Sequence, residues 1–340
     1  MSPPLAEGKL PPALLERLLR YTSRSPLLSV GASTGEDAAV AAGSDTIVLT
    51  ADPITFTDER IGTYTVAVNA NDVVAMGGKP VYLTTTILLP PGTGAEEVER
   101  IFADIADACG KADLLWVGGH TEVTPVVTRT VVAGQCVGFL SGAPLSTGGA
   151  RVGDVLCMSK WVGLEGTTTI ARERPRESRE CLGEEGFQAV LAWLDDPGIA
   201  IVEEGRALAG LALSSGHDPT EGGVAMGIHE ICTRSGTGAV VFSEALPVRE
   251  ETRRLCACFG MEPLGLLSSG VFLFTAARAI AEEACRLLAA RGIPAAVIGG
   301  IRDAAEGVTI ETGGLRRPLA YCVQDEIVKL RPSSPRPSTR

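Results

Sequence analysis

The sequence has few aromatic residues and no long apolar run. Aromatic side chains make up 4% of the 340 residues, which leaves few surfaces on which bases or sugars could stack. A membrane-spanning helix needs about 20 consecutive apolar residues, and no segment reaches that length. The opening residues, MSPPLAEGKLPP, do not combine a basic start with an apolar run, as a secretory signal would. We therefore expect a cytoplasmic protein that does not associate with a membrane.

Familiar catalytic and metal-binding motifs are also missing. The sequence contains no Walker A, GxGxxG, HExxH or CxxC pattern, which excludes P-loop ATPases, a clear Rossmann fingerprint and structural zinc fingers. Its nine Cys residues are scattered, and Cys256 and Cys258 are separated by one residue. In a chain without a secretory signal, we expect reduced and mostly buried thiols.

Basic residues are outnumbered by acidic ones. Lys and Arg total 30 and Asp and Glu total 41, which gives a net charge of −11. An acidic surface repels nucleic acid and anionic lipid at long range, so we expect neither as a partner. We expect a small buried substrate instead. If that substrate carries phosphate, the acidic side chains around it require a metal ion between them.

The pattern of strands and helices predicts two domains. Apolar strand segments such as 45–51 and 81–88 alternate with helical segments in both halves of the sequence, which is typical of α/β or α+β proteins. A polar, Gly-rich stretch at 141–153 marks the expected boundary. The predicted parts are an N-terminal helix and loop (1–30), an N-terminal domain (31–145), a C-terminal domain (146–325) and a disordered tail (326–340).

One segment matches the GxSxG pattern of serine hydrolases, with Ser33 between Gly31 and Gly35. That motif needs a strand before the Ser, a substantial helix after it, and then an acid and a His in chain order. Only EDAAVAAG separates Gly35 from the next predicted strand. We interpret the segment as a flexible loop, with contact between Ser33 and a phosphate as the alternative. The motif therefore does not favour a hydrolase.

Acidic residues recur beside glycines at the predicted ends of strands and helices. A carboxylate in such a place is accessible to a ligand, and several together require cations to neutralise their charge. Mg²⁺ that bridges phosphates is the usual solution. Each residue alone is more typical of a helix cap or a turn, and only the group favours a metal–phosphate site. The group consists of Asp37, Asp52, Asp72, Asp218 and Glu221.

Two further segments are candidates for contact with an anion. The segment 118–122 (GGHTE) follows a predicted strand at 113–117, and its backbone N–H groups either hold an anion or form an ordinary turn. His120 within it is either catalytic or structural. Lys160 lies at the end of another predicted strand, where it either meets a phosphate or is solvated.

Seven motifs occur in an order that resembles the aminoimidazole ribonucleotide (AIR) synthase-like superfamily. They are GEDAAV, TADP, NANDVVAMGGKP, VGGHTE, GDVLCMSKWVGLEGT, HDPTEGG and LLSSG, and they extend over roughly residues 30–310. The superfamily includes the purine cyclo-ligase, thiamine-monophosphate kinase, selenophosphate synthetase and the hydrogenase-maturation protein HypE. The DPTxGG and GLEGT segments are most similar to HypE. The resemblance implies two α/β domains, a β-barrel closed by the N-terminal domains of two subunits, and ATP bound in a cleft through Mg²⁺.

The resemblance also assigns roles to individual residues. Asp72 and His120 would be catalytic, although the kinase and HypE branches have Asp at the position of His120. Glu221 stands where the kinase branch has a second Asp and HypE has Arg. The metal ligands would be Asp37, Asp52, Asp72, Asp218 and Glu221. The residues that contact ATP would be Asp37, Asn71, Gly118, Gly119, Thr121 and Lys160. A homodimer is expected from the residues as well, because an apolar sheet with one uncovered face is too exposed for a monomer.

The sequence departs from each branch at a diagnostic position. HypE carries its carbamoyl group on a C-terminal Cys, whereas this sequence ends in PSSPRPSTR and its last Cys is Cys322. Selenophosphate synthetase has a reactive Cys or selenocysteine near its N-terminus, and residues 1–40 contain no Cys. We therefore expect an ATP- and Mg²⁺-dependent enzyme that phosphorylates an oxygen of a small substrate, as in amide or carbonyl activation. The alternative is a non-catalytic homologue that binds nucleotide or a protein partner.

Overall fold

Helices and strands are mixed in both halves of the chain, which confirms the predicted two-domain α/β class. The computed structural model describes residues 5, 8–9, 12–26, 28–30, 40–41, 46–55, 57–320 and 324–330. The chain forms two compact units. The first comprises Met1–Pro144 and Ala200–Arg206, and the second comprises Leu145–Ile199 and Ala207–Arg340. Within the described ranges, no helix combines the length and the apolar character that crossing a membrane requires.

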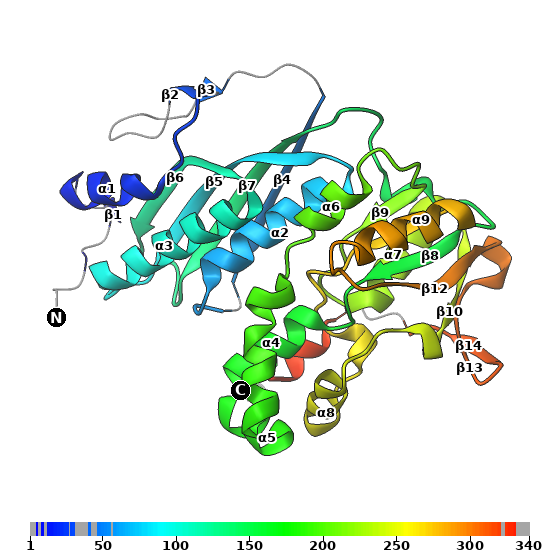
Figure 1. Ribbon diagram of the computed structural model, residues 1–340. Helices are drawn as coiled ribbons and strands as arrows, with labels where there is room; N and C mark the ends of the chain where they lie inside the picture. Colours follow the sequence, from blue (N-terminus) through cyan, green and yellow to red (C-terminus); the bar gives the residue numbers. More distant parts are fainter. Residues whose placement is uncertain are drawn as a thin grey trace, which may run out of the picture. The chain divides into compact units, whose positions relative to one another are not determined.

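The first unit is built on a five-stranded sheet with helices over one face (Figure 1). Its strands are β1 (Gly8–Lys9), β4 (Ile47–Ile54), β5 (Lys79–Leu89), β6 (Leu115–Val123) and β7 (Val131–Phe139). A separate pair consists of β2 (Leu28–Val30) and β3 (Val40–Ala41). The helices are α1 (Pro12–Leu18), the 3-10 helix η1 (Leu19–Tyr21), α2 (Ile61–Ala75) and α3 (Ala95–Ala112). The order in the sheet is β1-β6-β5-β7-β4, and β5 and β6 are parallel.

Small residues let α2 approach the sheet and α3 closely. A Cβ atom at Gly134 of β7 would lie 2.4 Å from Nδ2 of Asn69 in α2. On the side toward α3, a Cβ atom at Gly62 would lie 2.5 Å from the backbone N of Ile105. A larger residue at either glycine would push the elements apart, because protein interiors are close-packed. The helix α2 is buried along almost its whole length, which explains why its sequence shows no polar face.

The opposite face of the sheet carries apolar side chains that remain exposed. Successive side chains of a strand point to opposite faces. In β4, Ile47 (50% exposed) and Leu49 (67% exposed) alternate with residues that face α2. The half-exposed residues of β7 that pair with this row lie on the same face; they are Ala133, Gln135, Val137 and Phe139. In the described part of the chain, the β4–β7 part of this face is therefore mostly apolar and exposed.

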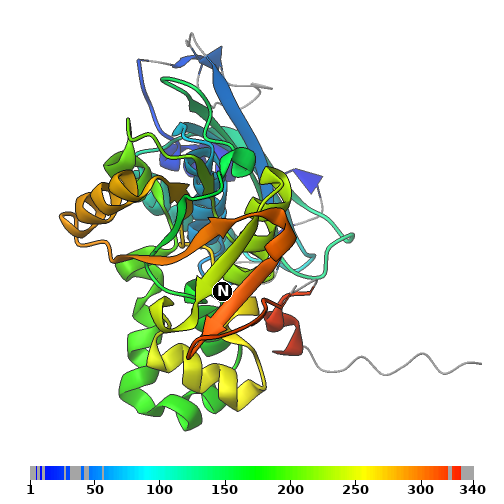
Figure 2. The same cartoon turned by 90° about the vertical axis from the view of Figure 1, so that its right-hand side faces the viewer.

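The second unit is built on a seven-stranded sheet. Its strands are β8 (Val155–Ser159), β9 (Ser215–His217), β10 (Gly238–Phe242), β11 (Leu273–Ala276), β12 (Ala295–Arg302), β13 (Val308–Thr312) and β14 (Leu315–Pro318). Its helices are α4 (Leu164–Glu173), α5 (Pro175–Ala192), α7 (Gly223–Ser235), α8 (Glu250–Phe259) and α9 (Arg278–Ala289). The strand order is β14-β13-β10-β12-β8-β11-β9. Figure 2 shows the β13–β14 hairpin beside β10 at one edge.

A segment from the second half of the chain belongs to the first unit. The helix α6 (Val202–Leu208) begins in this return segment, which consists of Ala200–Arg206. A Cβ atom at Gly205 would lie 2.7 Å from Cγ1 of Val74 in α2. The guanidinium of Arg206 donates to the backbone O of Ala112 at 3.2 Å. The division predicted at 145/146 contains no such return, because an apolar helix face shows that a helix is buried but not which domain covers it.

The predicted disordered tail begins too early. Glu326–Leu330 form the 3-10 helix η7, and Leu330 is 9% exposed. In the segment EIVKL, Leu330 is buried and Ile327 and Val328 are half-buried, whereas the Pro/Ser/Arg-rich composition starts only at Arg331. Residues 331–340 lie outside the described part of the chain.

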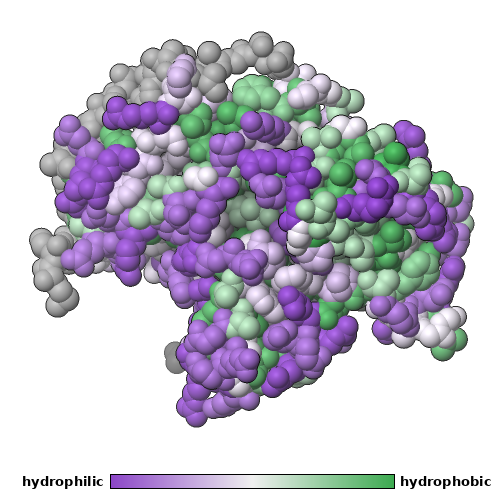
Figure 3. All heavy atoms as spheres, viewed as in Figure 1, coloured by the Kyte–Doolittle hydropathy of each residue, from purple (hydrophilic) through white to green (hydrophobic). Residues whose placement is uncertain are grey.

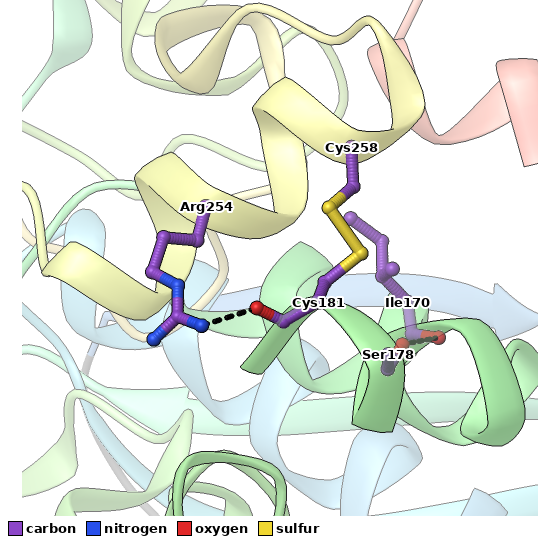
Figure 4. The surroundings of a disulfide bond; sticks show 5 residues. All are labelled: Ile170, Ser178, Cys181, Arg254 and Cys258. Atoms are coloured by element: carbon purple, nitrogen blue, oxygen red, sulfur yellow. Dashed lines mark hydrogen bonds between the residues drawn. A yellow bond between two sulfur atoms is a disulfide. The ribbon is translucent and has the colours of Figure 1, made fainter. Parts of the chain in front are cut away.

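A disulfide links two helices of the second unit, so the prediction of reduced thiols is wrong for two Cys residues. Cys181 of α5 is bonded to Cys258 of α8, with 6.5 Å between their Cα atoms (Figure 4). Hydrophilic side chains cover much of the outer surface of α5 (Figure 3). Because the two residues are 77 positions apart, no local spacing reveals the pair. The remaining described Cys residues are free, and all except the half-buried Cys285 are buried.

Candidate functional site

Two of the predicted metal ligands lie where β4 meets α2. Oδ1 of Asn69 accepts a hydrogen bond from the backbone N–H of Asp52 at 3.0 Å, and Nδ2 donates to the backbone O of Asp52 at 3.1 Å. About one turn further along α2, Asp72 accepts a hydrogen bond from the hydroxyl of Thr50. Asp52 and Asp72 are both half-buried. They are thus carried by a strand and a helix that are fixed to each other at both positions.

Asn69 is a site residue that the sequence reading missed. Its side chain is fully buried in an apolar helix, where an amide is stable only when it is hydrogen-bonded. Besides its two bonds to Asp52, it donates to the backbone O of Thr65 at 2.9 Å. The signal in the sequence is the pair of Asn residues in VNANDVV, of which the resemblance indicates only the second.

That second residue, Asn71, holds the return segment. Its side chain is fully buried, and its Oδ1 accepts a hydrogen bond from the backbone N–H of Ile201 at 2.8 Å. Asn71 therefore positions a segment that packs beside α2. Contact between Asn71 and ATP stays a prediction.

The interior beside Asp72 is poorly solvated. Burial, and to a lesser degree the negative charge of Asp72, raises the pKa of the Cys136 thiol to about 12. Cys136 therefore stays neutral at physiological pH. In such surroundings, attraction between a carboxylate and a cation is stronger than in water.

The two glycines Gly118 and Gly119 lie inside β6, so the alternative of an ordinary turn is wrong. Their φ angles are 135° and 151°, and a Cβ atom at Gly119 would lie 1.8 Å from the backbone O of Thr85 in β5. Only glycine fits such an approach in this conformation. On the other side of β6, β1 pairs only with Glu122 and Val123. In the described part of the chain, the edge of β6 at the glycines thus has no strand partner, and N–H groups on such an edge are available to an anion.

His120 and Thr121 point to opposite faces of the sheet. His120 pairs with Thr86, and Thr121 pairs with the buried Ile87. His120 is exposed, and its Nε2 lies 3.4 Å from Oε2 of Glu122. Thr121 faces the helices instead, because successive residues of a strand alternate. The structure therefore does not bring these two predicted site side chains together.

The second unit carries the other predicted site residues. Lys160 follows β8; it is 2% exposed, so the alternative of a solvated lysine is wrong. Its backbone has a φ of 52° and donates to the O of Pro294 at 2.7 Å. Asp218 directly follows β9 and is buried. Glu221 is exposed in the turn before α7.

Hydrogen bonds join three loops around these residues. The backbone N–H of Ser268 donates to the O of Thr220 at 3.3 Å. The hydroxyl of Ser268 accepts from the N–H of Gly163 at 3.0 Å, and the N–H of Gly166 donates to the O of Leu267 at 2.8 Å. The segments GLEGT, HDPTEGG and LLSSG, which are far apart in the sequence, are therefore neighbours in the structure.

Glu165 is a buried acid at this junction that the sequence reading also missed. Its side chain is 1% exposed. Burial is the main cause that raises its pKa to about 8, with the charges of Asp325 and Glu221 adding to it and hydrogen bonds to Ser269 opposing it. Its Oε2 has no hydrogen-bond partner in the part of the chain that the structure describes. The signal is the Glu of GLEGT at the start of a helix.

The described acidic residues do not form a metal cage. No group of three or more His, Cys, Asp or Glu side chains among them could hold an ion. Asp37 lies outside the described residues, as do Ser33 and Cys322. Mg²⁺ is commonly bound by one or two carboxylates together with phosphate oxygens. The donor set of Asp52 and Asp72 fits an ion of this kind, held jointly with a nucleotide.

Matches to family models identify the family. The N-terminal domain of AIR synthase related protein matches residues 33–140, and the C-terminal domain of AIR synthase related protein matches residues 151–311. The chain belongs to this family. The resemblance drawn from the seven motifs is confirmed, including the order of the two domains.

Individual relatives are of the HypE type. The chain is 30% identical to the carbamoyl dehydratase HypE of Azotobacter vinelandii over 275 residues, which cover 78% of this chain and 77% of that protein. It is 31% identical to the carbamoyl dehydratase HypE of Cupriavidus necator over 250 residues, which cover 71% and 66%. The crystal structure of hydrogenase maturation protein HypE in complex with ATP matches with a TM-score of 0.78 at 25% identity, covering 92% of this chain and 94% of that one.

Proposed function

We propose that the protein is an ATP- and Mg²⁺-dependent enzyme that phosphorylates an oxygen of a small substrate, with an amide or a carbonyl as the activated group. The observation that carries the proposal is the fixed placement of Asp52 and Asp72 at the β4–α2 junction. The similarity to a HypE structure solved with ATP supports it. An oxygen of the substrate would attack the γ-phosphorus, forming a P–O bond as the bond to the ADP oxygen breaks.

The residues of the first unit would bind and orient the phosphates. Asp52 and Asp72 would hold Mg²⁺, which when bound neutralises charge on the phosphate oxygens. Asn69 fixes the backbone of Asp52 to α2, the helix that carries Asp72. Backbone N–H groups at Gly118 and Gly119 would contact phosphate at the edge of β6. In phosphoryl transfer the protein itself carries out little covalent chemistry. Positioning of the reacting groups would therefore supply most of the rate enhancement.

The remaining predicted residues would contribute from the second unit and from β6. Lys160 and Asp218, both buried after a strand, would contact phosphate and metal respectively. Glu221 would be a further metal ligand. On β6, His120 would be a catalytic residue and Thr121 would contact ATP from the opposite face of the sheet.

We further propose a homodimer formed through the uncovered sheet face. Exposed apolar rows on β4 and β7 support this, because a face of this kind is characteristic of an interaction surface. A two-fold axis would pair the face with the same face of a second copy.

The test is calorimetric titration of the protein with ATP, with and without Mg²⁺, followed by measurement of ADP release with a panel of small carboxamides. We expect Mg²⁺-dependent binding and substrate-stimulated ADP release. Binding without turnover would favour the non-catalytic alternative, and no binding would contradict the proposal.

A variant pair tests the role of Asp72. Asp72→Asn keeps an oxygen that accepts the Thr50 hydroxyl but loses the charge, so we expect turnover to fall by a factor on the order of 100 without loss of fold. Asp107→Asn is the matched control, because Asp107 is an exposed acid on α3 that forms an ion pair with Lys111 of the same helix. Equal turnover in the two variants would refute the assignment.

A further inference from the structure

The C-terminal segment 324–330 returns to the loops of the second unit through Asp325. This residue is 7% exposed. Its Oδ2 accepts a hydrogen bond from the backbone N–H of Gly222 at 2.7 Å, and its Oδ1 accepts from the N–H of Ile327 at 2.8 Å. The backbone of Leu267 lies close enough to the carboxylate to act on its pKa.

These contacts reach all three of the joined loops. Gly222 belongs to HDPTEGG and Leu267 to LLSSG, and Glu165 of GLEGT lies close enough for the charge of Asp325 to act on it. The Asp325 carboxylate thus accepts a hydrogen bond from one of the three segments and lies near the other two. The family match to the C-terminal domain ends at residue 311, so this carboxylate comes from outside the matched region.

The chemistry of the contact requires an acceptor with two oxygens. Gly222 has a φ of 76° and directly precedes α7, so its N–H lies at the N-terminal end of that helix. A negative charge is favourable there, and hydrogen bonds to a carboxylate are stronger than those between neutral groups. An uncharged side chain of the same size would accept fewer of these bonds.

The rest of the segment is attached elsewhere. Oε2 of Glu326 accepts from the backbone N–H of Glu262 at 2.9 Å. The ammonium of Lys329 donates to the O of Gly260 at 2.9 Å, and Arg174 donates to the O of Leu330. Loss of the Asp325 carboxylate therefore removes the contact with the loops while the segment keeps its other attachments.

We propose that Asp325 is a positioning residue of the candidate site, which holds the loop 218–223 in the arrangement that presents Asp218 and Glu221 to a ligand. The role of the loop itself rests on the proposed function; the positioning of the loop does not. The C-terminal segment is in this view a part of the site and not an appendage of the fold.

Hydrogen exchange on the full-length protein tests the positioning directly. In Asp325→Ala, we expect peptides that cover 218–223 and 266–270 to exchange at least tenfold faster, with peptides from α9 unchanged. Asp325→Asn keeps one acceptor oxygen and is expected to give an intermediate rate. Glu326→Ala, the matched control in the same segment, is expected to leave both loops as in the wild type. Wild-type exchange in Asp325→Ala, or equal effects of Asp325→Ala and Glu326→Ala, would overturn the proposal.

The same variants connect the loop to ATP. If the wild type turns over Mg·ATP, we expect kcat/KM to fall at least tenfold in Asp325→Ala, to recover partly in Asp325→Asn and to stay unchanged in Glu326→Ala. Full kcat/KM in Asp325→Ala would overturn the role in the site even with faster exchange. Absence of ATP binding in the wild type would instead contradict the proposed function, and the exchange rates would still decide whether Asp325 positions the loop.

Discussion

The disulfide between α5 and α8 makes a quantitative prediction for the stability of the second unit. Cys181 and Cys258 close a loop of 77 positions, and in the chain-entropy model a loop of this length lowers the stability of the unfolded state by about 4.5 kcal/mol. Native disulfides typically contribute about 2–4 kcal/mol, less than the chain-entropy model gives, so we expect a measured loss of about 3 kcal/mol. With a urea m value of about 2 kcal/mol per molar, this corresponds to a midpoint lowered by about 1.5 M.

Tryptophan fluorescence reports on this unit during urea unfolding. Trp161 and Trp193 are both buried there, whereas Trp116 belongs to the first unit. The protein is measured with and without a reductant, and a variant with both Cys181→Ser and Cys258→Ser is measured in the same way. We expect the reductant to lower the midpoint of the wild type and to leave that of the double variant unchanged. Equal midpoints for the oxidised and reduced wild type would refute the reasoning, as would a double variant as stable as the oxidised protein.

Three further predictions concern the strand edge, the uncovered face and the buried acid. Gly119→Ala places a Cβ atom 1.8 Å from the O of Thr85, so we expect the urea midpoint of the first unit to fall by the equivalent of about 3 kcal/mol; Gly92→Ala, where nothing lies within 4 Å, should cost clearly less. Leu49→Lys puts a charge on the uncovered face and should convert a dimer into a folded monomer in sedimentation velocity, whereas Val126→Lys, at a position that is 80% exposed, should stay dimeric. The pKa of Glu165 is raised from 4.5 to about 8 in the folded state, so the folded protein binds the extra proton and its stability should decrease as pH rises between these values. Glu165→Gln should remove this part of the pH dependence. If the urea midpoint of the variant changed with pH between 5.5 and 8.5 as steeply as that of the wild type, the prediction would be contradicted.

Local patterns predict the elements of the fold well. The β-branched segments at 45–51 and 81–88 correspond to β4 and β5, because strand patterns are visible within a few residues. The acids Asp52 and Asp72 are indicated by their position beside predicted strand and helix ends. Their placement at one junction depends on Asn69, whose role appears only once β4 and α2 are packed together.

Contacts between distant segments leave little local trace. The pairing of Cys181 with Cys258 depends on the packing of two helices. The hydrogen bond from Gly222 to Asp325 joins residues that are 103 positions apart, so it depends on the path of the chain between them. For Gly118 and Gly119, the sequence leaves an ordinary turn open beside an anion-holding segment, because glycine pairs are common in turns. The structure shows why glycine is required at position 119: the backbone of Thr85 on the neighbouring strand leaves no room for a Cβ atom.

The return segment Ala200–Arg206 affects the order in which the protein is assembled during synthesis. The five strands of the first sheet are complete when residue 139 has left the ribosome, but the partner of Asn71 is Ile201, and Val74 contacts Gly205. Until more than 60 further residues have been made, α2 lacks the hydrogen bond from Ile201 to Asn71 and the close approach of Gly205 to Val74. A fragment that ends at Pro144 would have the same deficiency permanently. The first unit therefore depends on residues from the later half of the chain.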